Sequence, residues 1–154
     1  GCYIMGTKSV GIIGKVEKGG IMRLTTKSEY SLLALIYIAR QGEGKFVRID
    51  EICKAYDLPR KYLEHLLHIL KQSRYVRTRR GARGGYALAM PASKISVASV
   101  IRLMDGALAP TEAVSMYFFS ETPLMREKKI MRVFKEIRDY AARRLERLKL
   151  SDVI

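Results

Sequence analysis

Cysteine is scarce in this sequence of 154 residues, and long apolar runs are missing. The two cysteines, Cys2 and Cys53, are too few for a disulfide framework, and neither belongs to a Cys/His pattern with the spacing of metal ligands. The longest strongly apolar run, Leu32–Ala39, is far shorter than the roughly 20 residues that cross a bilayer. The start of the chain also lacks the charged and apolar regions of a signal peptide. We therefore expect a protein that works in the reducing cytoplasm.

Groups that would form a catalytic site are also missing. The only histidines are His65 and His68, and neither lies near a plausible nucleophile in the sequence. Their spacing of three residues could hold a metal ion, but no carboxylate or thiolate is placed to complete the ligand shell. The glycines Gly81, Gly84 and Gly85 lack the following Gly-Lys-Ser/Thr of a phosphate loop. The sequence therefore predicts neither an enzyme nor a metal site.

Acidic residues are few in comparison with basic ones. The chain has 29 Lys and Arg against 15 Asp and Glu, a formal net charge of +14. The excess is largest in residues 22–95, which carry 15 basic and six acidic side chains, against 11 and eight in residues 96–154. Such a charge attracts polyanions, although a basic surface can also serve solubility alone. The positions of the charges must decide between the two.

Residues 1–21 are rich in glycine and show no helical or strand period, so we expect them to be loosely ordered or to form a stray strand. Lys18-Gly19-Gly20 before Met22 is what a purine-rich ribosome-binding site would encode if it were translated in this frame. This indicates a non-native extension and translation that starts at Met22. A genuine N-terminal arm is the alternative.

Residues 22–95 show the signals of three helices and a hairpin. A capping box in Thr26-Lys-Ser-Glu29 begins the first helix, and Pro59 opens the third. The expected elements are helices over 26–40, 49–56 and 60–72 and strands over 75–78 and 86–89. This order is typical of a winged helix-turn-helix domain, in which one helix and one loop contact DNA. The fold class is therefore mainly α with a two-stranded β wing.

Residues 96–154 are expected to form a linker helix and a long helix that mediates dimerisation. Ser96 caps a helix that ends near Asp105, a less regular stretch surrounds residues 117–119, and a helix of about 25 residues follows over 124–149. Apolar residues recur along that helix every three to four positions: Ile130, Phe134, Ile137, Tyr140 or Ala141, Leu145 and Leu148. A single helix outside the compact domain cannot bury such a seam by itself, which predicts a homodimer.

The third helix separates a packing face from a free face. Leu63, Leu66, Leu67 and Leu70 share one side, and Lys61, Glu64, His65 and His68 lie opposite. The helix N-terminus favours a phosphate, to which Arg60 and Lys61 add charge and Tyr62 a hydroxyl. Glu64 can accept from a cytosine amino group and His65 can bond a purine edge. The alternative is that Glu64 and His65 are merely solvated.

The hairpin tip combines glycine and arginine. Gly81 and the neighbouring glycines allow a tight turn, and four arginines lie within seven residues, namely Arg77, Arg79, Arg80 and Arg83. Such crowding favours an anionic partner, and an arginine here can enter a narrow minor groove. A hairpin that is basic without binding DNA is the alternative.

Four segments resemble the Rrf-two family of bacterial regulators, whose members include IscR, NsrR and CymR. They are Met22-Arg-Leu-Thr-Thr-Lys-Ser-Glu-Tyr30, Tyr62-Leu-Glu64, Arg80-Gly-Ala-Arg-Gly-Gly-Tyr86 and Asp105-Gly-Ala-Leu-Ala-Pro110. The resemblance runs from Met22 to the last residue. It implies that Arg23 and Thr25 touch the DNA backbone and that Arg80 with Gly81 probes the minor groove. It also places Lys61, Tyr62, Glu64 and His65 on the recognition helix and the dimer contact on the long helix.

The chain departs from this family in one respect. Many members bind an iron–sulfur cluster through three cysteines, but residues 107–124 contain none, and Ala113 stands near the first cysteine position. The resemblance therefore implies no cofactor and a cysteine-free branch like CymR, in which a metabolic enzyme or a small metabolite supplies the signal. We expect a homodimeric repressor that reads a pseudo-palindromic operator in duplex DNA. The alternatives are a protein-interaction module without operator specificity and an RNA-binding domain.

Overall fold

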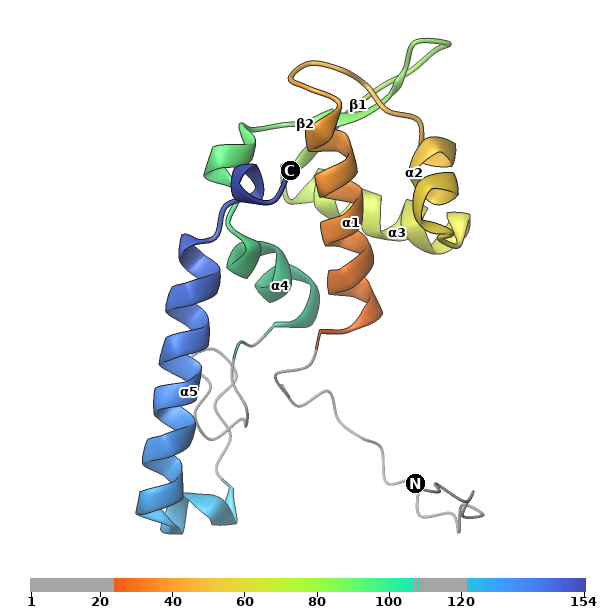
Figure 1. Ribbon diagram of the computed structural model, residues 1–154. Coiled ribbons are helices and arrows are strands. Elements are labelled where there is room, and N and C mark those ends of the chain that lie inside the picture. The colour runs from red at the N-terminus through yellow and green to blue at the C-terminus, as the bar shows by residue number, and fades with distance from the viewer. Residues whose placement is uncertain (1–23, 107, 109–121) are drawn as a thin grey trace, which may run out of the picture.

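The computed structural model describes residues 24–106, 108 and 122–154, and its fold is mainly helical with one two-stranded antiparallel sheet (Figure 1). The helices are α1 (Thr26–Arg40), α2 (Ile49–Tyr56), α3 (Arg60–Gln72), α4 (Val97–Asp105) and α5 (Lys128–Arg147), and the strands are β1 (Val76–Arg79) and β2 (Gly85–Leu88). Short 3-10 turns are η1 (Ala92–Lys94), η3 (Pro123–Arg126) and η4 (Leu150–Asp152). The expected winged-helix order is confirmed. The expectations for residues 1–21, Arg23, Ala113 and residues 117–119 lie outside the described residues.

The start of α1 differs from the predicted capping box. The N-cap is Thr25, in an extended conformation, and Thr26 already belongs to the helix. No side chain caps the first turn, because the hydroxyl and the amide of Thr25 both donate to the carboxylate of Asp105 at the end of α4. The box at Thr26 was therefore wrong. A tertiary contact between residues 80 positions apart replaces the expected local one.

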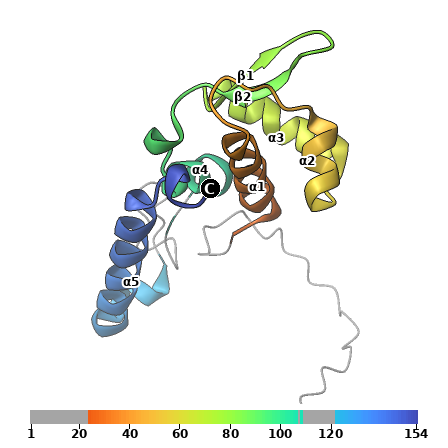
Figure 2. The same ribbon diagram turned by 45° about the horizontal axis from the view of Figure 1, so that its top comes forward.

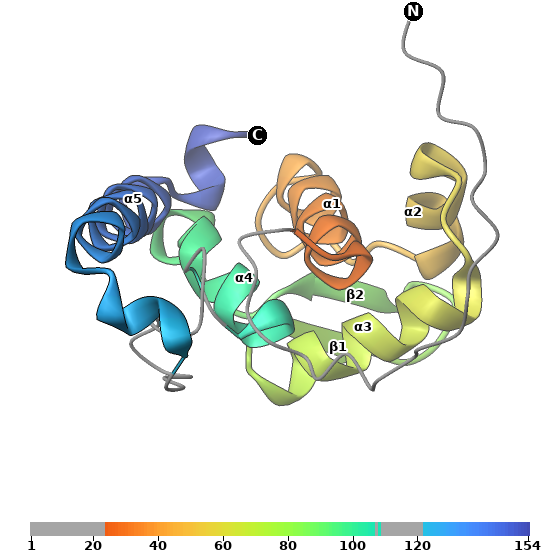
Figure 3. The same ribbon diagram turned by 90° about the horizontal axis from the view of Figure 1, so that it is seen from below.

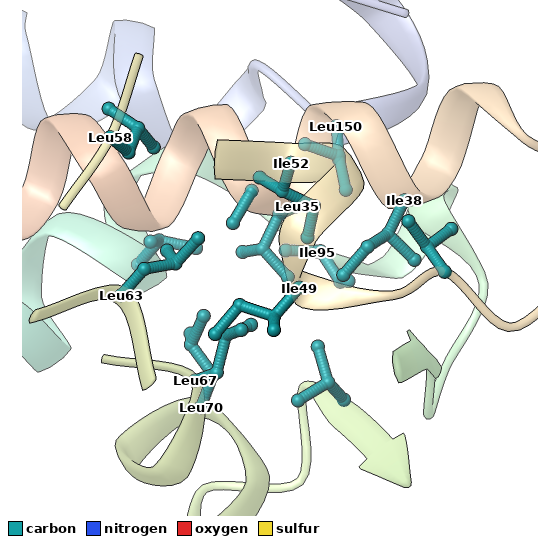
Figure 4. Close-up of a cluster of buried hydrophobic side chains, with 14 residues drawn as sticks. Leu35, Ile38, Ile49, Ile52, Leu58, Leu63, Leu67, Leu70, Ile95 and Leu150 are labelled. Carbon is teal, nitrogen blue, oxygen red and sulfur yellow. The ribbon is translucent and has the colours of Figure 1, made fainter. Parts of the chain in front are cut away.

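The main core lies between α1, α2, α3 and the chain end (Figure 4). The apolar side of α3 is fully enclosed, since Leu63, Leu66, Leu67 and Leu70 are all 0% exposed. Burying each leucine contributes about 1.5–3 kcal/mol, so the rotation of α3 about its axis is strongly determined. Leu150 of η4 packs into the same core. The core therefore crosses the domain boundary that we predicted at residue 95, and the division itself stays a prediction.

The hairpin is joined by the loop that precedes α2. The strands pair from Val76 with Leu88 to Arg79 with Gly85, and Val47 forms a further bridge to Tyr86. A Cβ at Gly85 would lie 2.3 Å from the carbonyl oxygen of Val47, and this glycine has a φ of +137°. Only glycine fits such a close backbone approach. The loop and the hairpin therefore form one layer.

Helix α5 is shorter than predicted and is partly packed. It begins at Lys128 rather than near Leu124, because η3 and the non-helical Glu127 (φ −93°, ψ 80°) precede it. Its last part lies against α4, where Leu145 and Leu148 pack on a small cluster of buried residues. Figures 1 and 2 show α5 on the flank opposite α2 and the hairpin tip. The long helix is therefore not wholly outside the compact domain.

Candidate nucleic-acid interface

The exposed side of α3 carries the side chains that the sequence suggested for DNA reading. Lys61, Glu64, His65 and His68 are all exposed, as predicted from the spacing. Tyr62 is half-buried instead, because its ring packs edge-on against Tyr30 of α1, with centroids 5.8 Å apart. Figure 3 shows α3 passing across one side of α1, which leaves the opposite side of α3 uncovered by any described element. Whether these residues bind DNA stays a prediction.

Arg60 does not stand alone at the start of α3. Its guanidinium forms an ion pair with Asp50 of α2, and its Nε donates to Glu64 Oε1 at 3.5 Å. Asp50 is the main cause of a raised pKa of Arg60, and Glu64 adds to it. The predicted phosphate ligand is thus shared with two carboxylates, one of which is the predicted base reader. Asp50 was missed in the sequence because its place beside Arg60 depends on how α2 packs against α3.

The exposed side of α3 lies close to the hairpin. Burial raises the pKa of the Tyr86 hydroxyl on β2, and the nearby Glu64 carboxylate raises it further, while Arg60 opposes the shift. Helix α3 also contacts β1 of the same hairpin. In Figure 2 the hairpin tip extends toward the end of the domain where α2 and α3 meet. One DNA duplex can therefore meet both elements together.

The four arginines of the hairpin fall into two groups. Tyr86 bridges to the buried Val47, so these two residues mark the core side of the ribbon. Arg77 and Arg79 pair with the two neighbours of Tyr86 along β2 and therefore lie on the opposite side, together with Phe46. The guanidinium carbons of Arg77 and Arg79 lie 5.1 and 4.2 Å from the centroid of the Phe46 ring.

The tip residues are placed differently. Arg80, Gly81 and Arg83 are exposed, and Gly81 has a φ of +100°, which favours glycine. The carbonyl of Arg83 accepts from Arg79 Nη2 at 2.7 Å, so the tip is tied to the strand that leads into it. Arg80 has no hydrogen bond or ion pair within the described part of the chain. The exposed guanidinium of Arg83 has none there either, so both tip arginines are available to a ligand.

Sequence reasoning missed three residues beside the hairpin, namely Lys45, Phe46 and Arg48. The signal was a short alternation in Phe46-Val47-Arg48, in which only the central residue is buried. A run this short resembles any loop until its strand partner is known. Thr25, a predicted backbone contact, is exposed but engaged by Asp105.

A family described as "Rrf2: Iron-dependent Transcriptional regulator" matches residues 24–154. The chain belongs to the Rrf2 family. The predicted family is therefore confirmed, and it is a family of transcriptional regulators rather than enzymes.

Individual Rrf2 relatives agree with this assignment. A helix-turn-helix-type transcriptional regulator of Mycobacterium tuberculosis H37Rv is 37% identical over 95 residues, which cover 62% of this chain and 59% of that protein. Protein rrf2 of Nitratidesulfovibrio vulgaris is 37% identical over 91 residues, 59% of this chain and 61% of that protein. The match thus spans about three fifths of these relatives. Among solved structures, CymR, the global cysteine regulator of B. subtilis, has a TM-score of 0.70 at 27% identity and covers 86% of this chain and 96% of that chain.

The family description names iron, and the two cysteines of this chain are the thiols that could hold it. Cys2 lies outside the described residues, and Cys53 is half-buried on α2, where burial, and then Asp50, raises the pKa of its thiol. In residues 24–106, 108 and 122–154, no three His, Cys, Asp or Glu side chains gather as metal ligands. The whole sequence has two cysteines, so one chain cannot supply the three thiolates that the resemblance implies for an iron–sulfur cluster. No helix in the same residues is long and apolar enough to cross a membrane.

Proposed function

We propose that this Rrf2-family protein is a homodimeric, DNA-binding transcriptional repressor that reads a pseudo-palindromic operator. One observation carries the proposal: α3, whose outer side is exposed, is in contact with β1 of the arginine-bearing hairpin, so a single duplex can contact both. Helix α3 would enter the major groove, where Glu64 and His65 face base edges. Arg80 and Gly81 at the tip would enter the neighbouring minor groove.

Phosphate contacts would place the protein on the duplex. Lys61 at the start of α3, Arg60 within its carboxylate pair and Thr25 at the start of α1 are the proposed backbone contacts near the major groove. Thr25 can contribute only if its hydroxyl leaves the carboxylate of Asp105. On the hairpin, the proposed contacts with backbone phosphates are Arg77, Arg79 and Arg83. Binding governed by such contacts weakens steeply as the salt concentration rises.

The dimer is proposed to form through α5. Four large apolar side chains along one stripe of the helix are exposed: Ile130 at 42%, Val133 at 49%, Ile137 at 42% and Tyr140 at 67%. Their spacing of three and four residues places them on one side, and a second copy of the same stripe is the simplest cover. Val133 therefore joins the predicted interface.

The remaining residues predicted for the dimer contact have partners in their own chain or are half-buried. Phe134 packs on Met131, Leu145 and Leu148 pack toward α4, and Ala141 is half-buried. We therefore place the centre of the proposed interface in the first part of α5.

The proposed signal is a small metabolite or a partner enzyme rather than a cofactor, because the donor set does not suit a cluster of thiolates. A regulator of this kind would act in the cytoplasm, where the chromosome lies.

A genome-wide binding map in the native bacterium tests the proposed function. The expected result is a set of enriched sites that share a palindromic motif with half-sites one or more helical turns apart. Transcription of the neighbouring genes should rise when the gene for this protein is deleted. Binding without any shared motif would contradict the proposal, and falling transcription would point to activation.

A further inference from the structure

A pocket of about 430 Å³ lies between the loop that precedes α2 and the hairpin. Four cationic side chains from these two segments line it: Lys45, Arg48, Arg79 and Arg83. The one carboxylate in its lining, Glu51, accepts the backbone amide of Arg48 at 3.1 Å. The pocket therefore has a strong excess of positive charge. Like charges gathered in this way repel one another unless an anion shares the space.

The pocket is also organised before any ligand arrives. Phe46 lies in its lining, and the guanidinium of Arg79 sits 4.2 Å from the centroid of that ring. The same guanidinium donates to the carbonyl of Arg83 at 2.7 Å. Neither contact neutralises the charge, and a guanidinium has five N–H donors, so others remain for a ligand. A fixed arginine loses less conformational freedom when it binds an anion.

We propose that this pocket binds a phosphate group, and that the phosphate belongs to the DNA backbone beside the minor groove. This inference rests on the proposed DNA binding. The minor groove is about 6 Å wide, so a hairpin tip inside it has a sugar–phosphate strand on each of its two sides. The pocket lies on the Phe46 side of the ribbon, opposite the core side. It is therefore placed for one strand while α3 follows the major groove.

Phe46 is a positioning residue in this arrangement. It touches no DNA, but its ring holds Arg79 in the pocket and Arg77 beside it. An aliphatic side chain would keep the packing and lose the attraction between the ring face and the cations. The sequence contains no sign of this role, because Phe46 and Arg79 are 33 positions apart.

The test measures binding to a mixed-sequence duplex by fluorescence anisotropy over a range of salt concentrations, because phosphate contacts do not depend on sequence. The Lys45→Gln/Arg48→Gln variant should lower the slope of log K against log salt by about 1 for each pocket, or about 2 for a dimer. The matched control, Lys94→Gln/Lys135→Gln, removes the same charge from exposed residues outside the pocket and should keep the wild-type slope.

Phe46→Leu should lower the slope with an unchanged melting temperature, and Phe46→Tyr should restore it. Wild-type slopes in both the double variant and Phe46→Leu would overturn the inference and leave the proposed function intact. A wild-type protein that binds no duplex would overturn both.

A second measurement separates the two sources of phosphate. Inorganic pyrophosphate is titrated into the free protein while the amide resonances of residues 44–48 and 79–84 are followed. Weak shifts together with a lowered DNA slope in the double variant support the backbone phosphate. Saturable binding that the double variant loses, with an unchanged DNA slope, would assign the pocket to a soluble phosphate compound and overturn the DNA assignment.

Discussion

The hairpin and α5 both present large side chains to solvent, but the two regions differ in how those side chains are held. In the hairpin, Arg77 and Arg79 rest on the Phe46 ring, so their charge is fixed in place without being neutralised. In α5, Ile137 and Tyr140 are exposed and outside every hydrophobic cluster of the described residues. Exposure alone therefore does not define a binding surface. We propose a polyanion as the partner of the hairpin, because its cations are held without being neutralised, and a second apolar stripe as the partner of α5.

The start of α3 is a third case, in which charge is fixed and also neutralised. Arg60 is paired with Asp50 and Glu64, and all three side chains are more than half exposed. Ion pairs at such exposure contribute little to stability. We propose that their effect is on DNA binding, because the two carboxylates lower the charge that Arg60 can offer to a phosphate.

The largest effect is expected from Ile137→Asp on α5. A carboxylate in the apolar stripe should prevent pairing, since burying an unpaired charge is costly. Loss of the dimer unlinks the two half-sites, so affinity for the palindromic operator should fall by about 10² or more. Sedimentation velocity and operator binding measure the two results. Lys135→Asp, on another side of α5, is the control, and a dimeric Ile137→Asp protein would remove α5 from the interface.

Arg80→Ala at the hairpin tip should have the next largest effect. Loss of a minor-groove contact should reduce operator affinity by roughly 1–3 kcal/mol, about 5- to 150-fold, with the dimer unchanged. Lys94→Ala serves as the control, because it removes an exposed charge outside the hairpin. Electrophoretic mobility shift at moderate salt checks this result. Unchanged affinity would exclude the tip from the interface.

Asp50→Asn should give a smaller change in the opposite direction. Arg60 is then paired with Glu64 alone, so affinity for a mixed-sequence duplex should rise and its salt dependence should steepen. The ratio of the affinity for the operator to the affinity for a mixed-sequence duplex should therefore fall. Glu127→Gln, at the start of α5, is the matched loss of one acidic charge. Equal affinities and equal salt dependences for Asp50→Asn and Glu127→Gln would contradict the proposed effect of Asp50 on Arg60.

The smallest effect concerns Cys53, which lies on α2 close to Asp50. Burial, and then Asp50, raises the pKa of its thiol, so less thiolate is present near neutral pH than in a free cysteine. Alkylation by iodoacetamide should therefore be slower than for a cysteine peptide, and its midpoint should lie at higher pH. A Cys2→Ser background isolates the signal. Asp50→Asn should accelerate the reaction slightly, and a rate equal to that of the peptide would refute this description of Cys53.

Much of the fold was predictable because its signals are local. The bounds of α2 and α3 and the cap of α4 by Ser96, whose hydroxyl accepts from the amide of Ser99, follow from periodicity and capping residues. The failures were places where distant contacts compete with local ones. Thr26 reads as a cap, but Asp105 engages Thr25 and moves the cap by one residue. The apolar seam of α5 is continuous in the sequence, but in the structure its last residues, Leu145 and Leu148, pack against α4.

The sequence by itself determined the family, the order of the elements and the exposed face of α3, because short-range spacing and side-chain type carry that information. Only the tertiary structure decided which cationic side chains remain available to a ligand. Arg60 and Arg79 are the same residue type, yet packing places one beside Asp50 and the other on Phe46. Coulombic and cation–π energies depend on distances between side chains that are far apart along the chain, and only the folded arrangement sets those distances.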